Sequence, residues 1–352
     1  MKIVTIIGAR PQFIKAATVS RIIKKYENIK EIIVHTGQHY DSNMSDVFFT
    51  ELDIPKPDYY LEAGSGSHAV QTGIILSRVE EVLIKEKPDW VLVYGDTNST
   101  IAGALAAVKI HIKTAHVEAG LRSFNRKMPE EINRIATDAI SDILFAPTQT
   151  AMINLQKEGL SNNAILSGDV MYDSILYYQK KINENPDKYK LKSIPELYYL
   201  ATVHRAENTD NIDNLKNILI AFSLINENII WPVHPRTRKI LTNIGDLPTN
   251  IKLIDPLGYL EMLSLLSGSI KVLTDSGGLQ KEAYFLNKPC ITMREETEWV
   301  ETLKGNRNII TGANSDLIVN AVNATISLAL QDENLFGDGN ASKIIIDAMN
   351  NS

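Results

Sequence analysis

Carboxylates follow the predicted strands in the N-terminal half of the chain, where they could serve as acids and bases. Asp96 follows the apolar run DWVLVYG, Glu118 follows KTAHV, and Glu130 and Glu131 open the helical segment PEEINR. Carboxylates in a partly dry site can differ in pKa, so that one donates a proton while another accepts one. Structural alternatives stay open: Asp96 could cap the helix near Ser99, and one glutamate of the pair could stabilise a helix N-terminus.

Two turns that join a strand to a helix are suited to binding phosphate. The turn in GARPQFIKA brings Arg10 and Lys15 to a helix start, and the turn in TDSGGLQKEA places Ser276, Gly277 and Gly278 at another. Backbone N–H groups at a helix N-terminus bind anions, and glycine lets a phosphate approach the backbone closely. Each turn alone is also explained as an ordinary helix cap or glycine turn.

Further polar side chains follow predicted strands in the C-terminal half. His204 lies in ATVHRAEN, His234 and Arg236 lie in WPVHPRTRKIL, and Arg294 follows KPCITM. These side chains could neutralise phosphate charge, whereas a solvated basic loop and a structural histidine are the alternatives. Glu282 lies one turn into the helix after the two glycines, where its carboxylate could accept hydrogen bonds from a ribose.

The elements that carry these residues alternate between strands and helices along the chain. Apolar runs such as KIVTII and DWVLVYGD are typical of parallel strands covered on both faces, and HAVQTGIILSRVEEVLIKEK has helical spacing. The pattern starts again after LSGDVMYDS. We therefore expect an α/β fold of two Rossmann-like, doubly wound parallel-sheet domains that face a cleft. The expected domains are 1–168 and 169–335, with a C-terminal helix in 336–352 that packs back on the first domain.

Composition excludes several classes of protein. The chain has 352 residues, is 44% hydrophobic and carries a formal net charge of −6, which argues against nucleic acid as a partner. Its single cysteine, Cys290, cannot form an intrachain disulfide and is expected to be a core thiol. No signal peptide, no apolar run approaching the ~20 residues of a membrane helix and no zinc-ligand spacing is present, so we expect a cytoplasmic protein without metal or membrane partner.

The motifs taken together resemble one enzyme family. GARPQFIK, TGQHYD, VYGDTNST, HVEAGLRS, PEEINR, VHRAEN, VHPRT, DSGGLQKEA and MREETEW occur in this order between residue 1 and about residue 345. This pattern resembles the non-hydrolysing UDP-N-acetylglucosamine 2-epimerases. The resemblance implies the two-Rossmann-domain architecture called GT-B, a UDP-sugar substrate, no cofactor and, as is common in related enzymes, a homodimer.

The resemblance also implies roles for individual residues. Asp96, Glu118, Glu130 and His204 match the catalytic positions of the family. UDP-binding positions of the family are matched by Arg10, Lys15, His234, Ser276, Gly277 and Gly278, and Glu282 matches the acid that holds the ribose hydroxyls. Arg122 and Arg294 lie in loops that match the sugar site, and Arg236 stays a UDP-binding candidate from its place after a strand.

The sequence departs from the common family pattern at two motifs. Members that act on UDP-N-acetylglucosamine usually read GTRPE and TERPE, whereas this chain has Ala9 and Gln12 in the first motif and reads TEWVE at 297–301. These variants are similar to the subgroup that converts UDP-2,3-diacetamido-2,3-dideoxyglucuronate to the mannuronate. Arg122, Arg126 or Lys127 could then pair with the substrate carboxylate.

The implied reaction is epimerisation at C2 through elimination of UDP to a glycal and its re-addition, in the synthesis of a surface polysaccharide precursor. UDP-N-acetylglucosamine is the second candidate substrate. A hydrolysing 2-epimerase that releases N-acetylmannosamine and a UDP-sugar-dependent GT-B glycosyltransferase remain alternatives, because they share the nucleotide-binding motifs.

Overall fold

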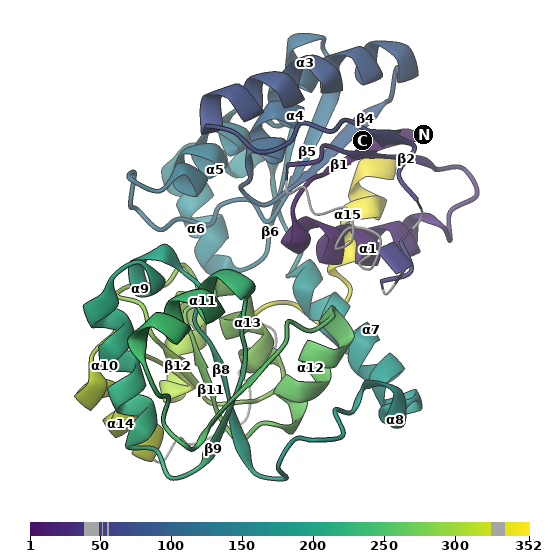
Figure 1. The fold of residues 1–352 in the computed structure, drawn as a ribbon. Coiled ribbons are helices and arrows are strands. Elements are labelled where there is room, and N and C mark those ends of the chain that lie inside the picture. The colour runs from purple at the N-terminus through teal and green to yellow at the C-terminus, as the bar shows by residue number, and fades with distance from the viewer. Residues whose placement is uncertain (39–48, 51, 55, 325–334) are drawn as a thin grey trace. The chain divides into compact units, whose positions relative to one another are not determined.

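The chain folds into two compact units. The structure, a computed structural model, describes residues 1–38, 49–50, 52–54, 56–324 and 335–352. Unit 1 comprises Met1–Tyr177 and Asn334–Ser352, and unit 2 comprises Tyr178–Glu333. Helix α7 (Val170–Glu184) runs from unit 1 into unit 2 (Figure 1).

Unit 1 is built on a seven-stranded parallel sheet with the order β3-β2-β1-β4-β5-β6-β7. The strands are β1 (Lys2–Ile7), β2 (Lys30–His35), β3 (Tyr59–Tyr60), β4 (Trp90–Tyr94), β5 (Lys113–Val117), β6 (Ile143–Ala146) and β7 (Ala164–Leu166). The helices within unit 1 are α1 (Arg10–Ile23), α3 (His68–Glu86), α4 (Asn98–Lys109), α5 (Pro129–Ile140), α6 (Gln149–Lys157) and α15 (Ala341–Asn350), with a short 3₁₀ turn at Ser161–Asn163.

Unit 2 is built on a six-stranded parallel sheet with the order β10-β9-β8-β11-β12-β13. The strands are β8 (Tyr198–Thr202), β9 (Asn228–Pro232), β10 (Ile251–Ile254), β11 (Val272–Thr274), β12 (Cys290–Thr292) and β13 (Asn308–Ile310). The helices are α8 (Pro186–Tyr189), α9 (Ala206–Thr209), α10 (Ile212–Ser223), α11 (Pro235–Ile244), α12 (Tyr259–Gly268), α13 (Gly277–Phe285) and α14 (Ser315–Asn323), with a 3₁₀ segment at Val300–Asn306.

The predicted fold class of two doubly wound parallel α/β sheets is confirmed. Every residue of β4 is buried, as the continuous apolar run requires for a central strand. Unit 2 has an equally apolar centre, in which Trp231 packs edge-on against Phe222. Cys290 is a buried core thiol, and burial raises its pKa to about 12.

The strand order reverses direction once in each sheet, between β1 and β4 and between β8 and β11. Helices on the two sides of such a point diverge, which leaves room for a ligand at the carboxyl ends of the strands. The turns after β1 and β4 carry Arg10 and Asp96, and the turns after β8 and β11 carry His204 and Ser276. The topology therefore gathers the polar residues of each unit at its own switch point.

The last helix belongs to unit 1 although it is distant in sequence. Figure 1 shows α15 in yellow beside α1. Ile345, Ile346 and Met349 of α15 are buried, and the Tyr26 hydroxyl donates a hydrogen bond to Asp347. None of the helices in the described part of the chain is long and apolar enough to span a membrane.

Gly120 offers a test of close packing in the turn after β5. A Cβ at this residue would lie 2.5 Å from the Ala151 carbonyl oxygen, and its φ is +79°. Gly159 has a φ of +78° with no heavy atom within 4 Å of such a Cβ. Both alanine variants meet the left-handed backbone penalty, but only Gly120→Ala also forces a clash with backbone. We expect Gly120→Ala to lower Tm by at least about 3 °C more than Gly159→Ala in a circular dichroism melt.

Equal Tm values for the two alanine variants would contradict this packing argument, because the backbone penalty is common to both.

Candidate active site

The turn after β1 brings the first glycine motif into contact with neighbouring turns. A Cβ on Gly8 would lie 2.0 Å from the Thr36 Oγ1 and 2.3 Å from the Ser99 Oγ, so only glycine fits here. Helix α1 begins at Arg10, and Pro11 occupies its first turn, where a missing N–H costs no hydrogen bond. Arg10 is half-buried at this helix start.

Lys15 of α1 lies next to one of the predicted catalytic acids, Glu118. Its ammonium forms a buried ion pair with Glu118, although these residues are 103 positions apart in the chain. Gly95 borders this pair, because a Cβ there would lie 3.2 Å from both the Lys15 Nζ and the Glu118 Oε2. Glu118 itself has a φ of +75°, a strained conformation for a residue with a side chain.

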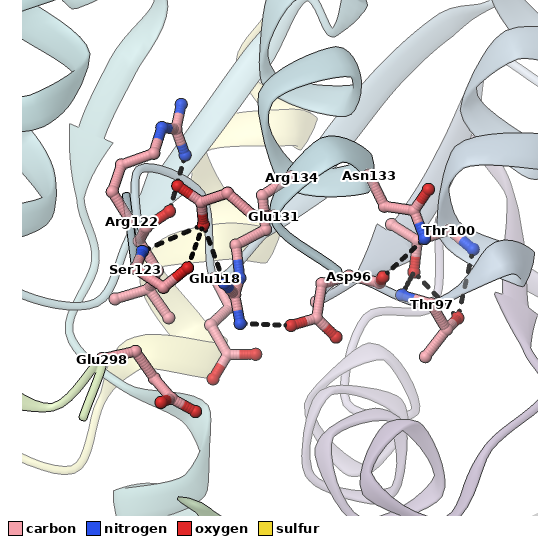
Figure 2. Close-up of polar contacts among 12 residues, drawn as sticks. Asp96, Thr97, Thr100, Glu118, Arg122, Ser123, Glu131, Asn133, Arg134 and Glu298 are labelled. Carbon is pink, nitrogen blue, oxygen red and sulfur yellow. Dashed lines mark hydrogen bonds and ion pairs between the residues drawn. The ribbon is translucent and has the colours of Figure 1, made fainter. Parts of the chain in front are cut away.

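Asp96 belongs to the same cluster through a second cation. The Arg134 guanidinium contacts the Asp96 Oδ2 at 2.5 Å and the Glu131 Oε2 at 3.1 Å, and Figure 2 shows Arg134 between these two acids. The side chain of Asp96 keeps 27% exposure, whereas that of Arg134 keeps 6%. Of the two acids that Arg134 contacts, Asp96 is therefore the one whose carboxylate reaches solvent.

The pKa of Asp96 reflects this crowded environment. Burial raises it, the positive charges of Arg134 and Lys15 counteract the rise, and the negative charges of Glu118 and Glu130 add to it. The net result is a pKa above the ordinary aspartate value. Asp96 is therefore electrostatically coupled to Arg134, Lys15, Glu118 and Glu130.

The two adjacent glutamates of PEEINR have different environments. Glu131 is buried and accepts hydrogen bonds from the Ser123 N at 2.9 Å, the Phe124 N at 3.0 Å and the Ser123 Oγ at 3.1 Å. Glu130 is exposed at the first turn of α5. Glu131 therefore has the structural role at the helix N-terminus, and Glu130 keeps a carboxylate that solvent or a ligand can reach.

Arg122 is oriented differently from our expectation of a sugar-site residue. All three guanidinium nitrogens are engaged inside unit 1: Nε and Nη2 donate to Glu158, Nη2 also contacts Asp138, and Nη1 donates to the Leu121 carbonyl. The same Asp138 contacts His116 at 2.7 Å. Arg122 is thus part of a buried structural network, because a buried guanidinium needs anionic partners.

In unit 2, a residue that the sequence analysis missed organises the switch point. Asp275 is fully buried and accepts hydrogen bonds from the backbone N of His204 at 3.0 Å, the backbone N of Arg205 at 3.0 Å and the Asn208 Nδ2 at 3.1 Å. The His204 Nδ1 lies 3.2 Å from the Asp275 Oδ1, and the histidine side chain is 51% exposed. An aspartate at the end of a buried strand, next to two glycines, was the available signal.

The predicted phosphate turn forms the start of α13. The Ser276 Oγ accepts a hydrogen bond from the Leu279 N, so Ser276 is the helix N-cap. Gly277 and Gly278 form the first turn, and Glu282 lies buried farther along the helix. A Cβ on Gly277 would lie 2.7 Å from a Glu298 oxygen, so a residue with a side chain would clash with this carboxylate.

The three basic residues predicted to bind the UDP-sugar in unit 2, Arg294, His234 and Arg236, differ in exposure and in their contacts. Arg294 is buried and contacts Glu298 at 3.0 Å. His234 is exposed and caps α11, where its Nδ1 accepts a hydrogen bond from the Arg236 N. Arg236 forms an ion pair with Asp210 in which both side chains are more than half exposed, and such pairs contribute little stability. Across the described residues, no group of three or more His, Cys, Asp or Glu side chains has a metal-binding arrangement.

The comparison with family models decides the affiliation. Residues 21–350 match the model described as UDP-N-acetylglucosamine 2-epimerase. The chain belongs to the UDP-N-acetylglucosamine 2-epimerase family. The predicted family and the predicted enzyme class, an isomerase acting on a carbohydrate, are confirmed.

Relatives in this epimerase family match over nearly the whole length. A UDP-N-acetylglucosamine 2-epimerase homolog of Methanococcus maripaludis is 56% identical over 100% of both chains. The UDP-2,3-diacetamido-2,3-dideoxy-D-glucuronate 2-epimerase of Pseudomonas aeruginosa is 52% identical over 98% of both. The crystal structure of Methanocaldococcus jannaschii UDP-GlcNAc 2-epimerase in complex with UDP-GlcNAc and UDP matches with a TM-score of 0.91, at 43% identity over 100% of both chains.

The ion pair between Arg134 and Asp96 generates a titration test in this epimerase. Removing the positive charge disfavours ionised Asp96, so Arg134→Met should raise the Asp96 pKa further above the ordinary value. Arg134→Lys keeps a cation and is the matched control. The measurement is a carbon NMR titration of protein labelled at the aspartate carboxyl carbons, with Asp96→Asn to assign the signal. An Asp96 pKa in Arg134→Met at or below the wild-type value contradicts the assignment.

Proposed function

We propose that this protein inverts C2 of a UDP-2-acetamido sugar without net hydrolysis, by eliminating UDP and adding it back. The observation that carries the proposal is the cluster in unit 1, where two carboxylates, Asp96 and Glu118, each contact a cation beside the switch point. Neither a simple sugar-binding protein nor a glycosyl transfer requires such a coupled acid–base group.

The chemistry explains why acids and a phosphate site are needed together. The C2 proton of a 2-acetamido sugar has no neighbouring carbonyl, so it is weakly acidic in the ground state. As the C1–O bond breaks, its electron pair leaves with the β-phosphate oxygen of UDP and C1 becomes cationic. A carboxylate then takes the C2 proton, and the C–H electron pair forms the C1=C2 bond of the glycal. Proton delivery to the opposite face of C2 and attack of UDP on C1 restore all atoms in the epimer.

The groups of unit 1 suit the two proton transfers. Inversion requires a base on one face of C2 and an acid on the other, so one group takes the C2 proton and a second group delivers another. Lys15 stabilises the anionic form of Glu118, and Arg134 does the same for Asp96. Exposed Glu130 is the third candidate for a proton-transfer group, because its negative charge raises the pKa of Asp96.

The groups of unit 2 suit the leaving group. The backbone N–H groups of Gly277 and Gly278 at the start of α13 would stabilise the diphosphate as negative charge develops. His204, oriented by buried Asp275, presents a half-exposed imidazole that could donate to a phosphate oxygen. His234 and Arg236 would add charge neutralisation, and Glu282 would accept hydrogen bonds from the ribose. Arg10, which lies in unit 1, is a further candidate for charge neutralisation.

The preferred substrate is UDP-2,3-diacetamido-2,3-dideoxyglucuronate, with UDP-N-acetylglucosamine second. The first is supported by the Pseudomonas aeruginosa relative at 52% identity and by the sequence departures at Ala9 and 297–301. The second is supported by the Methanocaldococcus jannaschii structure with UDP-GlcNAc. Because Arg122 is used inside unit 1, exposed Arg126 and Lys127 are the remaining candidates for the substrate carboxylate.

Solvent isotope incorporation tests the proposed reaction. We expect that incubation with each UDP-sugar alone in deuterium oxide places deuterium at C2 of the epimer, because the group that delivers a proton to the opposite face of C2 exchanges that proton with water. Proton NMR follows the C2 signal, the anomeric signals of both epimers and free UDP. Absence of deuterium at C2 with both sugars would sink the epimerase proposal, and steady accumulation of UDP with free sugar would indicate the hydrolysing reaction.

Glu118→Gln tests the acid–base cluster. The amide keeps the size of the side chain but cannot exchange a proton, so we expect kcat to fall by about 10²–10⁴-fold, the usual contribution of general acid–base catalysis. UDP affinity, measured by calorimetry, should change little, because the amide keeps the size of the side chain and most of the proposed nucleotide-binding groups lie in unit 2. The matched control is Glu158→Gln, which removes a partly exposed carboxylate that contacts Arg122. Near-normal turnover of Glu118→Gln removes Glu118 from the mechanism.

A further inference from the structure

Gln12 is a buried polar residue of the first motif, in unit 1. Only 1% of its surface is exposed, so its side chain is not available for a substrate. Its Oε1 accepts hydrogen bonds from the backbone N of Gly8 at 2.8 Å and of Ala9 at 3.0 Å. Its Nε2 donates to the Tyr94 carbonyl at 2.9 Å and to the Thr97 and Thr100 hydroxyls at 3.0 Å. The amide therefore joins the turn after β1 to the turn after β4.

The chemical identity of an amide matters at this position. The Tyr94 carbonyl can only accept a hydrogen bond, and the backbone N–H groups of Gly8 and Ala9 can only donate. A side chain that meets both needs one donor and one acceptor, which glutamine provides at every pH. A glutamate, the residue usual in members that read GTRPE, provides both only when it carries a proton. A methionine of similar size provides neither.

The two turns that Gln12 joins carry the reactive cluster. Asp96 lies in the turn between Tyr94 and Thr97, next to Gly95. Lys15 is one helical turn after Gln12 on α1 and pairs with Glu118. The side-chain amide of Gln12 thus connects the turn that carries Asp96 with the start of the helix that carries Lys15, at the point where the strand order reverses.

We propose that Gln12 is a positioning residue that holds Asp96 in register with the Lys15–Glu118 pair. This inference rests on the proposed epimerase function. It also gives the departure from GTRPE a physical meaning: residue 12 acts on the reaction through the geometry of two turns, and substrate contact is left to other residues.

The main test compares Gln12→Met with a matched control in the full-length protein. Gln71→Met removes a buried amide that also bridges segments of unit 1, through hydrogen bonds with the Gln38 carbonyl, the Gly64 carbonyl and Asn98. We expect Gln12→Met to lower kcat by at least about tenfold, since small misplacements of catalytic groups are costly, with KM and UDP affinity within about threefold. Gln71→Met should lower Tm comparably and leave kcat within about twofold.

Gln12→Glu provides a readout that a purely structural role would not move. Above its pKa the carboxylate faces the Tyr94 carbonyl oxygen without a proton, and kcat should fall as in Gln12→Met. As the pH is lowered, the protonated carboxyl regains a donor, and the ratio of its kcat to that of wild type should rise by up to about tenfold per pH unit. The titrations of Asp96, Glu118, Glu130, Lys15 and Arg134 occur in both proteins and therefore largely cancel in this ratio.

Three results would overturn the proposal. Gln12→Met with wild-type kcat shows that the amide does not position Asp96. Equal losses of kcat in Gln12→Met and Gln71→Met at equal Tm show a general packing effect. A pH-independent ratio for Gln12→Glu shows that the donor to Tyr94 is irrelevant. Wild-type protein that turns over neither UDP-sugar overturns the proposed function itself and this proposal with it, whereas the first three results leave the proposed function intact.

Discussion

The cost of removing charge from water governs the architecture of the site in unit 1. A buried carboxylate needs a cation or several donors, and a buried cation needs acids. Glu118 contacts Lys15, Asp96 contacts Arg134, and Arg134 also contacts Glu131. The first two of these ion pairs join elements distant in the chain, so satisfying the charges also brings the turns of the sheet into one fixed arrangement.

This constraint separates residues that hold the site together from residues that remain available for chemistry. Glu131 forms its hydrogen bonds with two backbone N–H groups, the Ser123 hydroxyl and Arg134. Arg122 forms its contacts with Glu158, Asp138 and a backbone carbonyl inside unit 1. Asp96 keeps partial exposure and a raised pKa, and Glu130 stays exposed. Asp275 does for unit 2 what Glu131 does for unit 1, because a buried carboxylate anchors the backbone beside an exposed functional side chain.

Membership of the epimerase family gives these arrangements a chemical context. A reaction that breaks a glycosidic bond to UDP and moves a proton at the neighbouring carbon needs anion stabilisation and acid–base groups at once. The switch points of the two sheets offer one set of groups each: helix starts and histidines in unit 2, and paired carboxylates in unit 1. The proposed substrate and the proposed role of Gln12 both rest on positions at which the chain departs from the common family motifs.

The sequence by itself determined the fold class, the family and which turns carry polar residues. Apolar runs of strand length followed by glycine turns specify parallel α/β units because hydrophobic periodicity is a local property. The sequence alone could not show that Lys15 forms an ion pair with Glu118 or that Arg122 is buried in a network of acids. Nor could it show that Asp275 contacts His204, or that Glu131 is the member of the Glu130–Glu131 pair with the structural role. Those facts depend on the strand order, which places β1 beside β4 and β8 beside β11, and on burial, which decides which charges must find partners. Strand order and burial arise only when distant segments pack together, so a local pattern of residues does not reveal them.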